Sequence, residues 1–214
     1  MSSTRRTGKR DPNDNYPTPA WVVDALLDAV ATNSSPIRNP SLRLSLDFGS
    51  PLLSIVEPTA GEGAIIKRIL NHPHIKTLDI TAVEVRRDAR DALCKLIPYN
   101  RVITKDVTTI RYQSSYRYDL AIVNPPFNNA MAIAKWCLEN ARVVCLLQRA
   151  SWSYTAARYE FMEQHKPDIL QLTNRPSFTG KGTDSADYAW YIFHGSSNSR
   201  TYRTKPLSIK ERRQ

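Results

Sequence analysis

The pattern of apolar and polar positions along the chain has two periodicities, which predict alternating strands and helices. Apolar residues at helical spacing predict a helix over 21–30, and a stretch rich in Ser, Pro and Asn over 32–52 predicts a loop. Short apolar runs then predict strands over 52–56, 78–83, 101–104, 118–123 and 142–147. Periodic segments between them predict helices over 63–71, 86–97, 128–141 and 154–165. This alternation is typical of a mostly parallel sheet with helices on both faces.

The last part of the pattern differs, because no helix separates its two strands. Apolar runs over 169–173 and 187–193 are joined only by a loop over 175–186. Strands joined in this way favour an antiparallel pair at one edge of the sheet. We therefore expect an α/β domain with a Rossmann-like, mostly parallel, seven-stranded sheet and an antiparallel edge pair.

Length and composition suit one such domain. The 214 residues are 41% hydrophobic, which allows a substantial core and leaves little room for a separate recognition domain. No apolar run approaches the roughly 20 residues that cross a bilayer, and the N-terminus does not resemble a secretory signal. Cys94, Cys137 and Cys145 lack metal-ligand spacing, so we interpret them as small buried residues. We expect a cytoplasmic protein that binds neither a metal nor a membrane.

The net charge of +10 is concentrated at the two ends of the chain. Residues 1–10 carry +4 and residues 200–214 carry +5, so that 11–199 carry only +1. We therefore expect a flexible basic tail over 1–14, a folded domain over 15–199 and a second basic tail over 200–214. Such tails either contact phosphate groups in a salt-dependent manner or only raise solubility. Binding of a polyanion is the favoured interpretation.

Acidic and small residues follow the first three predicted strands, where ligands of such sheets bind. The first strand leads into Glu57-Pro58-Thr59-Ala60-Gly61-Glu62-Gly63, whose small residues let the backbone approach a ligand. This segment is neither a dinucleotide fingerprint nor a P-loop. Glu84 can accept hydrogen bonds from two ribose hydroxyls, and Asp106 from an adenine amino group. Each acidic residue alone is more often a helix cap or part of a solvated turn. Three acceptors at the ends of successive strands favour one shared binding site.

Asn124-Pro125-Pro126-Phe127 directly follows the fourth predicted strand. Its two prolines fix the backbone and remove two N–H donors. The Asn124 side-chain oxygen and the Pro125 carbonyl can both accept from one –NH₂ group, and so stabilise the charge that develops when its nitrogen is methylated. Phe127 offers an apolar face for a flat ring. The alternative is a proline-rich turn with a buried phenylalanine.

In this order the motifs resemble those of the N6-adenine and N4-cytosine DNA methyltransferases, which share the class I methyltransferase fold. The resemblance covers about 15–195 and is most specific at the tetrad, which it implies to be catalytic. It also implies that the chain binds S-adenosylmethionine through Tyr16, Thr18, Pro19, Glu57, Pro58, Thr59, Ala60, Gly61, Glu84, Asp106, Val107 and Asn124. Tyr16-Pro17-Thr18-Pro19 resembles the segment that closes over the methionine part of this cofactor. Arg175-Pro176-Ser177-Phe178 is similar to a late segment whose aromatic ring holds the base.

The reaction implied by the resemblance is methyl transfer to the N6 amine of adenine in DNA, which in a duplex requires base flipping. The substrate-binding candidates are Phe127, Arg149, Trp152 and Phe178, although a core position suits Trp152 equally well. No insertion between Asp106 and Asn124 is large enough for a recognition domain. We therefore expect low sequence specificity, or help from a homodimer or a separate specificity partner, and we favour DNA over RNA.

Other acceptors remain open because they need the same chemistry. An adenine of RNA, the N2 amine of guanine and a protein glutamine amide all present an –NH₂ group. The resemblance favours adenine among them, because relatives that act on glutamine or guanine more often carry tyrosine at the position of Phe127. A catalytically silent module that keeps the fold as a scaffold is a further alternative. Against it stands the complete set of Glu57, Gly61, Glu84, Asp106 and Asn124.

Overall fold

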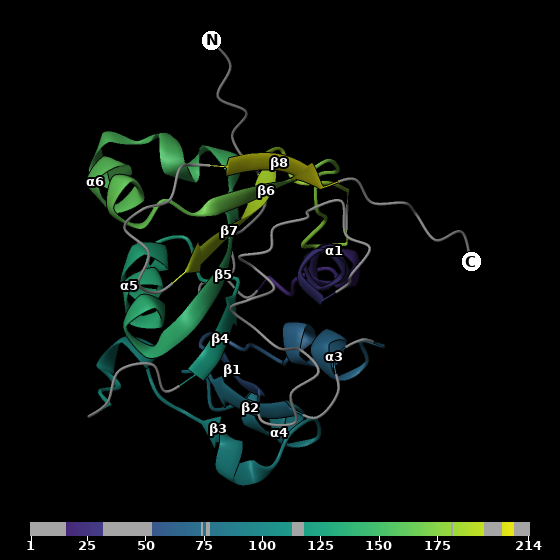
Figure 1. Cartoon of the computed structure of the whole chain (residues 1–214). Coiled ribbons are helices and arrows are strands. Elements are labelled where there is room, and N and C mark those ends of the chain that lie inside the picture. The colour runs from purple at the N-terminus through teal and green to yellow at the C-terminus, as the bar shows by residue number, and fades with distance from the viewer. Residues whose placement is uncertain are drawn as a thin grey trace.

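The computed structural model describes residues 16–31, 53–73, 75, 78–112, 118–180, 182–194 and 203–207. The N-terminal tail and the predicted loop over 32–52 lie outside these residues. Figure 1 shows one twisted sheet between two groups of helices. None of the helices in the described part of the chain is long and apolar enough to cross a membrane.

The sheet has the strand order β3-β2-β1-β4-β5-β7-β6-β8. Its strands are β1 (Leu53–Glu57), β2 (Leu78–Val83), β3 (Val102–Ile103), β4 (Tyr118–Val123), β5 (Ala141–Arg149), β6 (Asp168–Leu172), β7 (Tyr188–His194) and β8 (Arg203–Leu207). Strands β1 to β5 pair in parallel, and β7 lies antiparallel between β5 and β6. The predicted mostly parallel sheet with an antiparallel pair is thus confirmed, and β8 adds an eighth strand to the seven that the sequence predicts.

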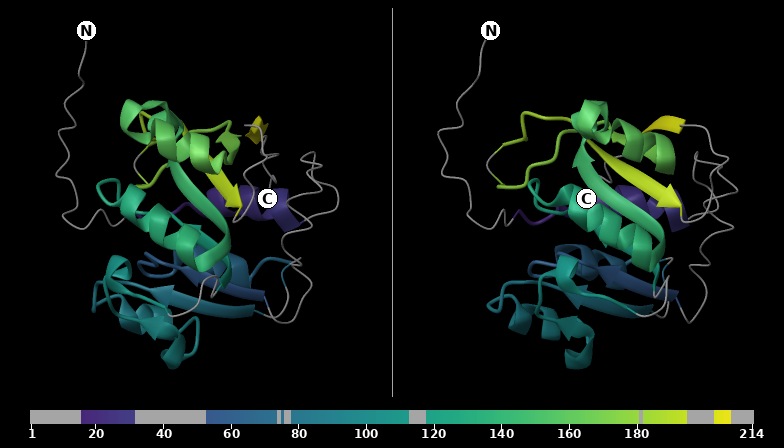
Figure 2. Two further views of the ribbon diagram at one scale, coloured as in Figure 1. Left: turned by 60° about the vertical axis from the view of Figure 1, so that its left-hand side comes forward. Right: turned by 90° about the vertical axis from the view of Figure 1, so that its left-hand side faces the viewer.

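Two groups of helices cover the sheet (Figure 2). One group packs into the larger core cluster and the other into the second: α1 (Ala20–Ala31), α3 (Ala64–Leu70) and α4 (Arg90–Cys94) on one face, α5 (Ala130–Asn140) and α6 (Ala156–His165) on the other. Helix α4 is shorter than the prediction of 86–97. The Arg86 N–H donates to the Glu84 carboxylate at 2.9 Å, which holds this stretch in a turn instead of a helix.

The C-terminal tail needs a correction, because β8 lies within the predicted flexible segment over 200–214. This strand pairs in parallel with β6, in the register Asp168↔Arg203 to Leu172↔Leu207. Without it, β6 would leave a row of backbone N–H and C=O groups unpaired at the edge of the sheet. Pro206 is tolerated there because an edge strand needs hydrogen bonds on only one side.

Trp190 fastens the N-terminal helix to the sheet. Its side chain is fully buried in β7, and its indole Nε1–H donates to the Val22 carbonyl of α1 at 3.0 Å. A buried indole needs such an acceptor, because an unpaired N–H in the core is costly. The bond joins residues that lie 168 positions apart in the chain. Through it, the position of α1 depends on the last part of the sheet.

We expect the substitution Trp190→Phe to lower the free energy of unfolding by about 2 kcal/mol, because it removes this hydrogen bond and leaves a cavity. Urea denaturation followed by circular dichroism measures the change. Tyr159→Phe is the matched control, since Tyr159 is 65% exposed and should leave stability unchanged. Equal stability of the Trp190→Phe variant and the wild type would contradict the assigned role.

Candidate active site

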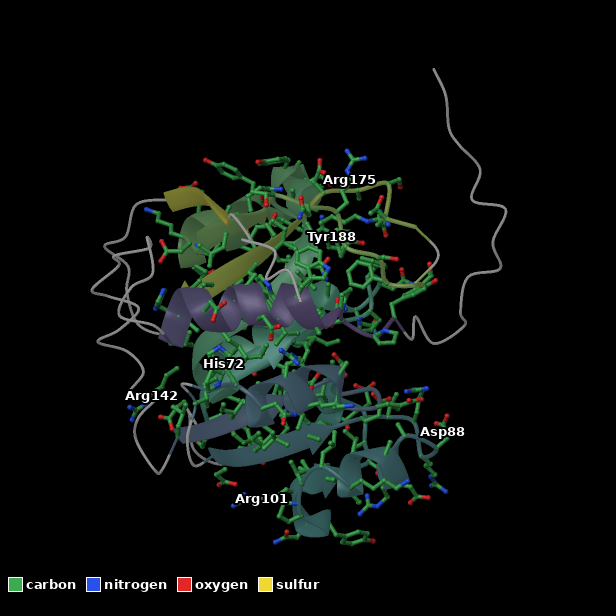
Figure 3. All side chains as sticks on the ribbon, turned by 90° about the vertical axis from the view of Figure 1, so that its right-hand side faces the viewer. His72, Asp88, Arg101, Arg142, Arg175 and Tyr188 are labelled. Atoms are coloured by element: carbon green, nitrogen blue, oxygen red, sulfur yellow. The ribbon has the colours of Figure 1, made fainter. Side chains whose placement is uncertain are left out.

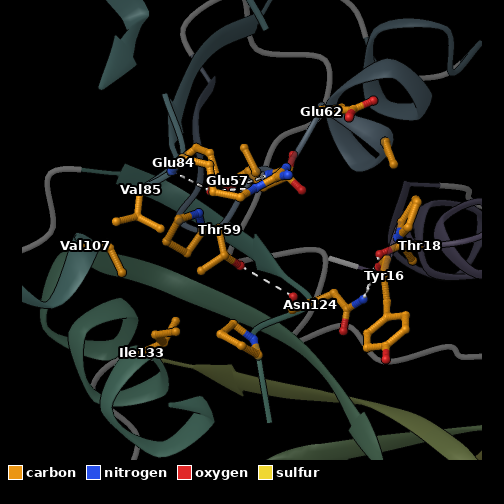
Figure 4. A pocket seen from close by; sticks show the side chains of 18 of the residues that line it. Tyr16, Thr18, Glu57, Thr59, Glu62, Glu84, Val85, Val107, Asn124 and Ile133 are labelled. Atoms are coloured by element: carbon orange, nitrogen blue, oxygen red, sulfur yellow. Dashed lines mark hydrogen bonds and ion pairs between the residues drawn. The ribbon is translucent and has the colours of Figure 1, made fainter. Parts of the chain in front are cut away.

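A cavity of about 550 Å³ lies where β1, β2, β3 and β4 end (Figure 4). Its lining includes almost every predicted cofactor residue: Tyr16, Thr18, Glu57, Pro58, Thr59, Ala60, Gly61, Glu84, Asp106, Val107 and Asn124. Pro19 is the exception, because it stands at the start of α1, where its carbonyl accepts from the Val22 N–H at 3.0 Å. The parallel strands thus bring together residues that are far apart in sequence.

The loop between β1 and α3 turns at two glycines. Gly61 and Gly63 have φ values of +55° and +81°, in the left-handed region that other residues enter only at a cost. A Cβ atom at Gly63 would also lie 2.5 Å from the Leu96 side chain. The loop can therefore hold its backbone against the cavity only with glycine at these positions.

Glu84 ties the end of β2 to this loop. Its side chain is buried, and its Oε2 accepts from the Gly61 N–H at 2.6 Å. The other oxygen, Oε1, accepts from the Arg86 N–H at 2.9 Å and lies 3.4 Å from the Arg86 guanidinium. Each carboxylate oxygen carries a second lone pair. Glu84 can therefore hold the loop and still accept hydrogen bonds from a ligand in the cavity.

Glu57 is the most buried acid of the site, with 3% of its surface exposed. Burial raises the pKa of this carboxyl well above its ordinary value, the Ile66 N–H that donates to it at 3.3 Å lowers it, and the charge of Glu84 raises it further. A buried carboxylate is poorly solvated, so a positively charged ligand group stabilises it more than it would stabilise an exposed carboxylate. Glu57 therefore favours a cation in the cavity.

Asp106 both caps a short helix and lines the cavity. Its Oδ1 accepts from the Thr108 N–H at 2.9 Å and from the Thr108 hydroxyl at 2.8 Å, at the start of the 3₁₀ helix Val107–Thr109. This is the capping role that the sequence left open. No described residue donates to Oδ2, which leaves that oxygen for a ligand. The two roles of Asp106 are therefore compatible.

The Asn124 side chain is oriented by the segment that precedes α1. Its Nδ2 donates to the Thr18 hydroxyl at 3.1 Å and to the Tyr16 carbonyl at 3.4 Å (Figure 4). A carbonyl can only accept, so the Tyr16 contact decides which end of the amide is the nitrogen. No described residue donates to Asn124 Oδ1. The amide oxygen is therefore the end that remains for a ligand donor.

The sequence reasoning missed an apolar wall of the cavity. Val85, Val107 and Ile133 line it and lie on one side in Figure 4, and among them only Val107 was expected. Val85 is 65% exposed, which is unusual for a valine next to a buried acid. An apolar residue directly after Glu84 was the available signal. Such a wall suits a flat, apolar ring.

Two of the substrate-binding candidates lie in contact. The Arg149 guanidinium lies over the Phe127 ring, 4.7 Å from its centroid. Phe178 packs against Tyr188 with 5.0 Å between the ring centroids. Phe127 and Phe178 both border the core cluster that includes Tyr188. These side chains form a surface at the ends of β4 and β5 and the start of β7.

Trp152 does not belong to this surface, which corrects its assignment as a substrate-binding residue. It is 5% exposed and packs edge-on against Tyr191 and Phe161 in the core cluster beneath α6. The 3₁₀ helix Ala150–Tyr154 turns its ring inward directly after β5. Of the two positions that the sequence allowed for Trp152, the core position is the observed one.

No protein-family model matches this sequence, and no curated protein matches it. Solved structures do match. A proposed RNA methyltransferase from Pyrococcus horikoshii is 18% identical over 92% of this chain and 94% of its own, with a TM-score of 0.59. A proposed class I S-adenosylmethionine-dependent methyltransferase from Listeria monocytogenes is 11% identical over 95% and 69% of the two chains, with a TM-score of 0.60.

A third similar structure is the methyltransferase subunit of a type I restriction-modification system from Streptococcus thermophilus. It is 11% identical over 86% of this chain, with a TM-score of 0.61, and this chain covers 45% of its length. The chain therefore has the fold of the class I S-adenosylmethionine-dependent methyltransferases, as its motifs led us to expect. The cavity lies at the strand ends, where ligands of such sheets bind.

We expect Glu57→Gln to raise the free energy of unfolding at neutral pH. Because the folded-state pKa of Glu57 is raised, stability is complete below its unfolded pKa and is lost as the pH rises through its folded pKa. Glutamine cannot ionise, and its oxygen can still accept from the Ile66 N–H. The gain should be near zero at about pH 4 and larger at about pH 8 in urea denaturation. The same pH dependence in variant and wild type would contradict this account.

Proposed function

We propose that the protein is an S-adenosylmethionine-dependent methyltransferase that methylates the N6 amine of adenine in DNA. The observation that carries this proposal is the orientation of Asn124. Tyr16 and Thr18 take the amide nitrogen, so that the amide oxygen faces no donor among the described residues. An oxygen held in this way is suited to accept from an amino group, and the Pro125 carbonyl follows in the chain.

The residues of the cavity fit the cofactor. Glu84 and Asp106 each have lone pairs left for ligand donors, which suits ribose hydroxyls and an adenine amino group. Glu57 suits the positive charge of the methionine part, and the wall of Val85, Val107 and Ile133 suits the adenine ring. When bound, S-adenosylmethionine supplies an electrophilic methyl group. Every other contribution comes from side chains and backbone of the protein.

Asn124 and Pro125 act on the acceptor amine. Two N–H···O bonds, to Asn124 Oδ1 and to the Pro125 carbonyl, direct the nitrogen lone pair out of the ring plane. They also stabilise the positive charge that would develop on the nitrogen as the new N–C bond forms and the methyl–sulfur bond breaks, the sulfur leaving as a neutral thioether. Pro125 and Pro126 have no N–H group, so no backbone donor of theirs competes for these oxygens. The methylated amine then releases its extra proton to water, and no strong base is required.

We propose adenine and DNA because the tetrad resembles that of the N6-adenine DNA methyltransferases. Phe127 of the tetrad also offers a face on which a flat ring can stack. The similarity to a restriction-modification subunit supports a DNA substrate. RNA is the second candidate, because the match to the proposed RNA methyltransferase spans nearly the full length of both chains. The basic ends of the sequence suit either polyanion. Recognition of a sequence would then come from a second copy or a separate partner.

Labelled S-adenosylmethionine, incubated with duplex DNA, single-stranded DNA, RNA and protein extract, tests the proposal. Nucleoside analysis should find the label in N6-methyladenine from DNA. Label in N6-methyladenine from RNA alone would select the second candidate. Label confined to protein, or found as 4-methylcytosine or N2-methylguanine, would overturn the adenine assignment.

We expect Asn124→Ala to lower turnover at least about a hundredfold, because the oxygen that stabilises the developing charge is lost. Binding of S-adenosylmethionine, measured by calorimetry, should survive, since Glu57, Glu84 and Asp106 remain. Asn100→Ala is the matched control, because Asn100 is exposed in the 3₁₀ helix Tyr99–Arg101, which precedes β3. Unchanged turnover in Asn124→Ala would remove Asn124 from the catalytic mechanism.

A further inference from the structure

Arg149 occupies a place on Phe127 that is expected for a substrate. Its guanidinium carbon lies 4.7 Å from the centroid of the phenyl ring. A guanidinium is planar and delocalised, and it stacks on an aromatic face much as a nucleobase does. Phe127 is the ring that the proposed function assigns to the acceptor base. A base and the guanidinium therefore compete for the same surface.

One N–H group of Arg149 lacks a hydrogen-bond acceptor among the described residues. This group is the Nε–H, whose nitrogen is buried. A buried donor without an acceptor is unfavourable, and native proteins contain few of them. The group lies next to the ring on which a base would stack. Because this N–H lies in the plane of the guanidinium, it could donate to a ligand atom beside the stack and leaves the face of the guanidinium open to a base.

Tyr188 is the partner of Arg149 in the register between β5 and β7. Burial raises the pKa of the Tyr188 phenol, and the neighbouring Arg149 side chain opposes that rise. The phenol donates in turn to Asp184 Oδ2 at 3.2 Å. Figure 3 shows Tyr188 just below Arg175 in the upper part of the view, apart from Asp88, His72 and Arg142. Arg149 thus lies beside Tyr188 at the carboxyl end of β5.

We propose that Arg149 contacts the acceptor directly and covers its outer face, so that the base is held between the Phe127 ring and the guanidinium. This inference rests on the proposed function and deepens it. The guanidinium moves outward by about the thickness of one ring when the base enters, which the flexible arginine side chain allows. A slot between two planar groups selects a flat ring over the narrow, non-aromatic amide of a glutamine side chain. Arg149 would therefore restrict the substrate to nucleobases.

Steady-state kinetics with an adenine-containing single-stranded oligonucleotide tests the role of Arg149. In Arg149→Ala, we expect KM for the oligonucleotide to rise about tenfold, as the loss of one stacked cation predicts, while kcat changes much less. Arg149→Lys should not restore KM, because an ammonium keeps the charge and loses the plane. The affinity for S-adenosylmethionine should equal that of the wild type in both variants, which also shows that they fold.

Arg158→Ala is the matched control. The Arg158 guanidinium also lies over an aromatic ring, 5.1 Å from the centroid of Trp152, but that ring belongs to the core beneath α6. The KM of the Arg158→Ala variant for the oligonucleotide should equal that of the wild type. A second readout is the fluorescence of 2-aminopurine at the target position, which stacking quenches. The bound oligonucleotide should be brighter with Arg149→Ala than with wild type or Arg158→Ala.

The outcomes separate this inference from the proposed function. If the wild type methylates no nucleobase, the proposed function fails, and the covering role of Arg149 fails with it. If the wild type methylates adenine and Arg149→Ala keeps its KM, only the role of Arg149 is overturned. Full rescue by Arg149→Lys would also overturn it, because a phosphate contact that needs charge alone would then explain the effect.

Discussion

The Asn124 amide nitrogen donates to the Thr18 hydroxyl and the Tyr16 carbonyl, which lie 106 and 108 positions earlier in the chain. These hydrogen bonds bring the segment before α1 to the end of β4, where it forms one wall of the cavity. They also determine that the amide presents its oxygen. The rest of the fold supports this arrangement, since Trp190 of β7 holds α1 in place through the Val22 carbonyl. Cavity wall and acceptor chemistry therefore depend on the same pair of contacts.

On the other side of Asn124, the cavity gathers acceptors at the ends of adjacent strands. Glu57, Glu84 and Asp106 lie within one lining, and the proximity of Glu84 is one reason that the pKa of Glu57 is raised. Burial of Glu57 beside the charge of Glu84 disfavours the ligand-free protein, because the Glu57 carboxylate loses solvation and is repelled by its neighbour. A ligand with a positive charge and several donors relieves both effects. Among the three acids, Glu57 is thus buried without a basic partner in the described part of the chain, at the place where a ligand would bind, whereas Glu84 lies 3.4 Å from the Arg86 guanidinium.

Much of this site could be predicted because it depends on local sequence. Short apolar runs indicate parallel strands, and four polar residues stand just after the ends of those runs: Glu57, Glu84, Asp106 and Asn124. Because the carboxyl ends of parallel strands meet at one edge of the sheet, the pattern predicts that these side chains lie together. Features that depend on distant partners could not be predicted. Strand β8 has the mixed sequence Arg-Thr-Lys-Pro-Leu and forms through the open edge of β6. The inward turn of Trp152 and the stacking of Arg149 on Phe127 depend on contacts between separate elements, which periodicity does not report.

A crystal structure with S-adenosylhomocysteine and an adenine-containing trinucleotide would test whether the Asn124 amide oxygen binds the acceptor amine. We expect the adenine N6 atom to lie about 3 Å from both Asn124 Oδ1 and the Pro125 carbonyl. We also expect that the Asn124 nitrogen still donates to Thr18 and Tyr16. An adenine bound away from Asn124, or an amide turned so that its nitrogen faces the base, would contradict the account.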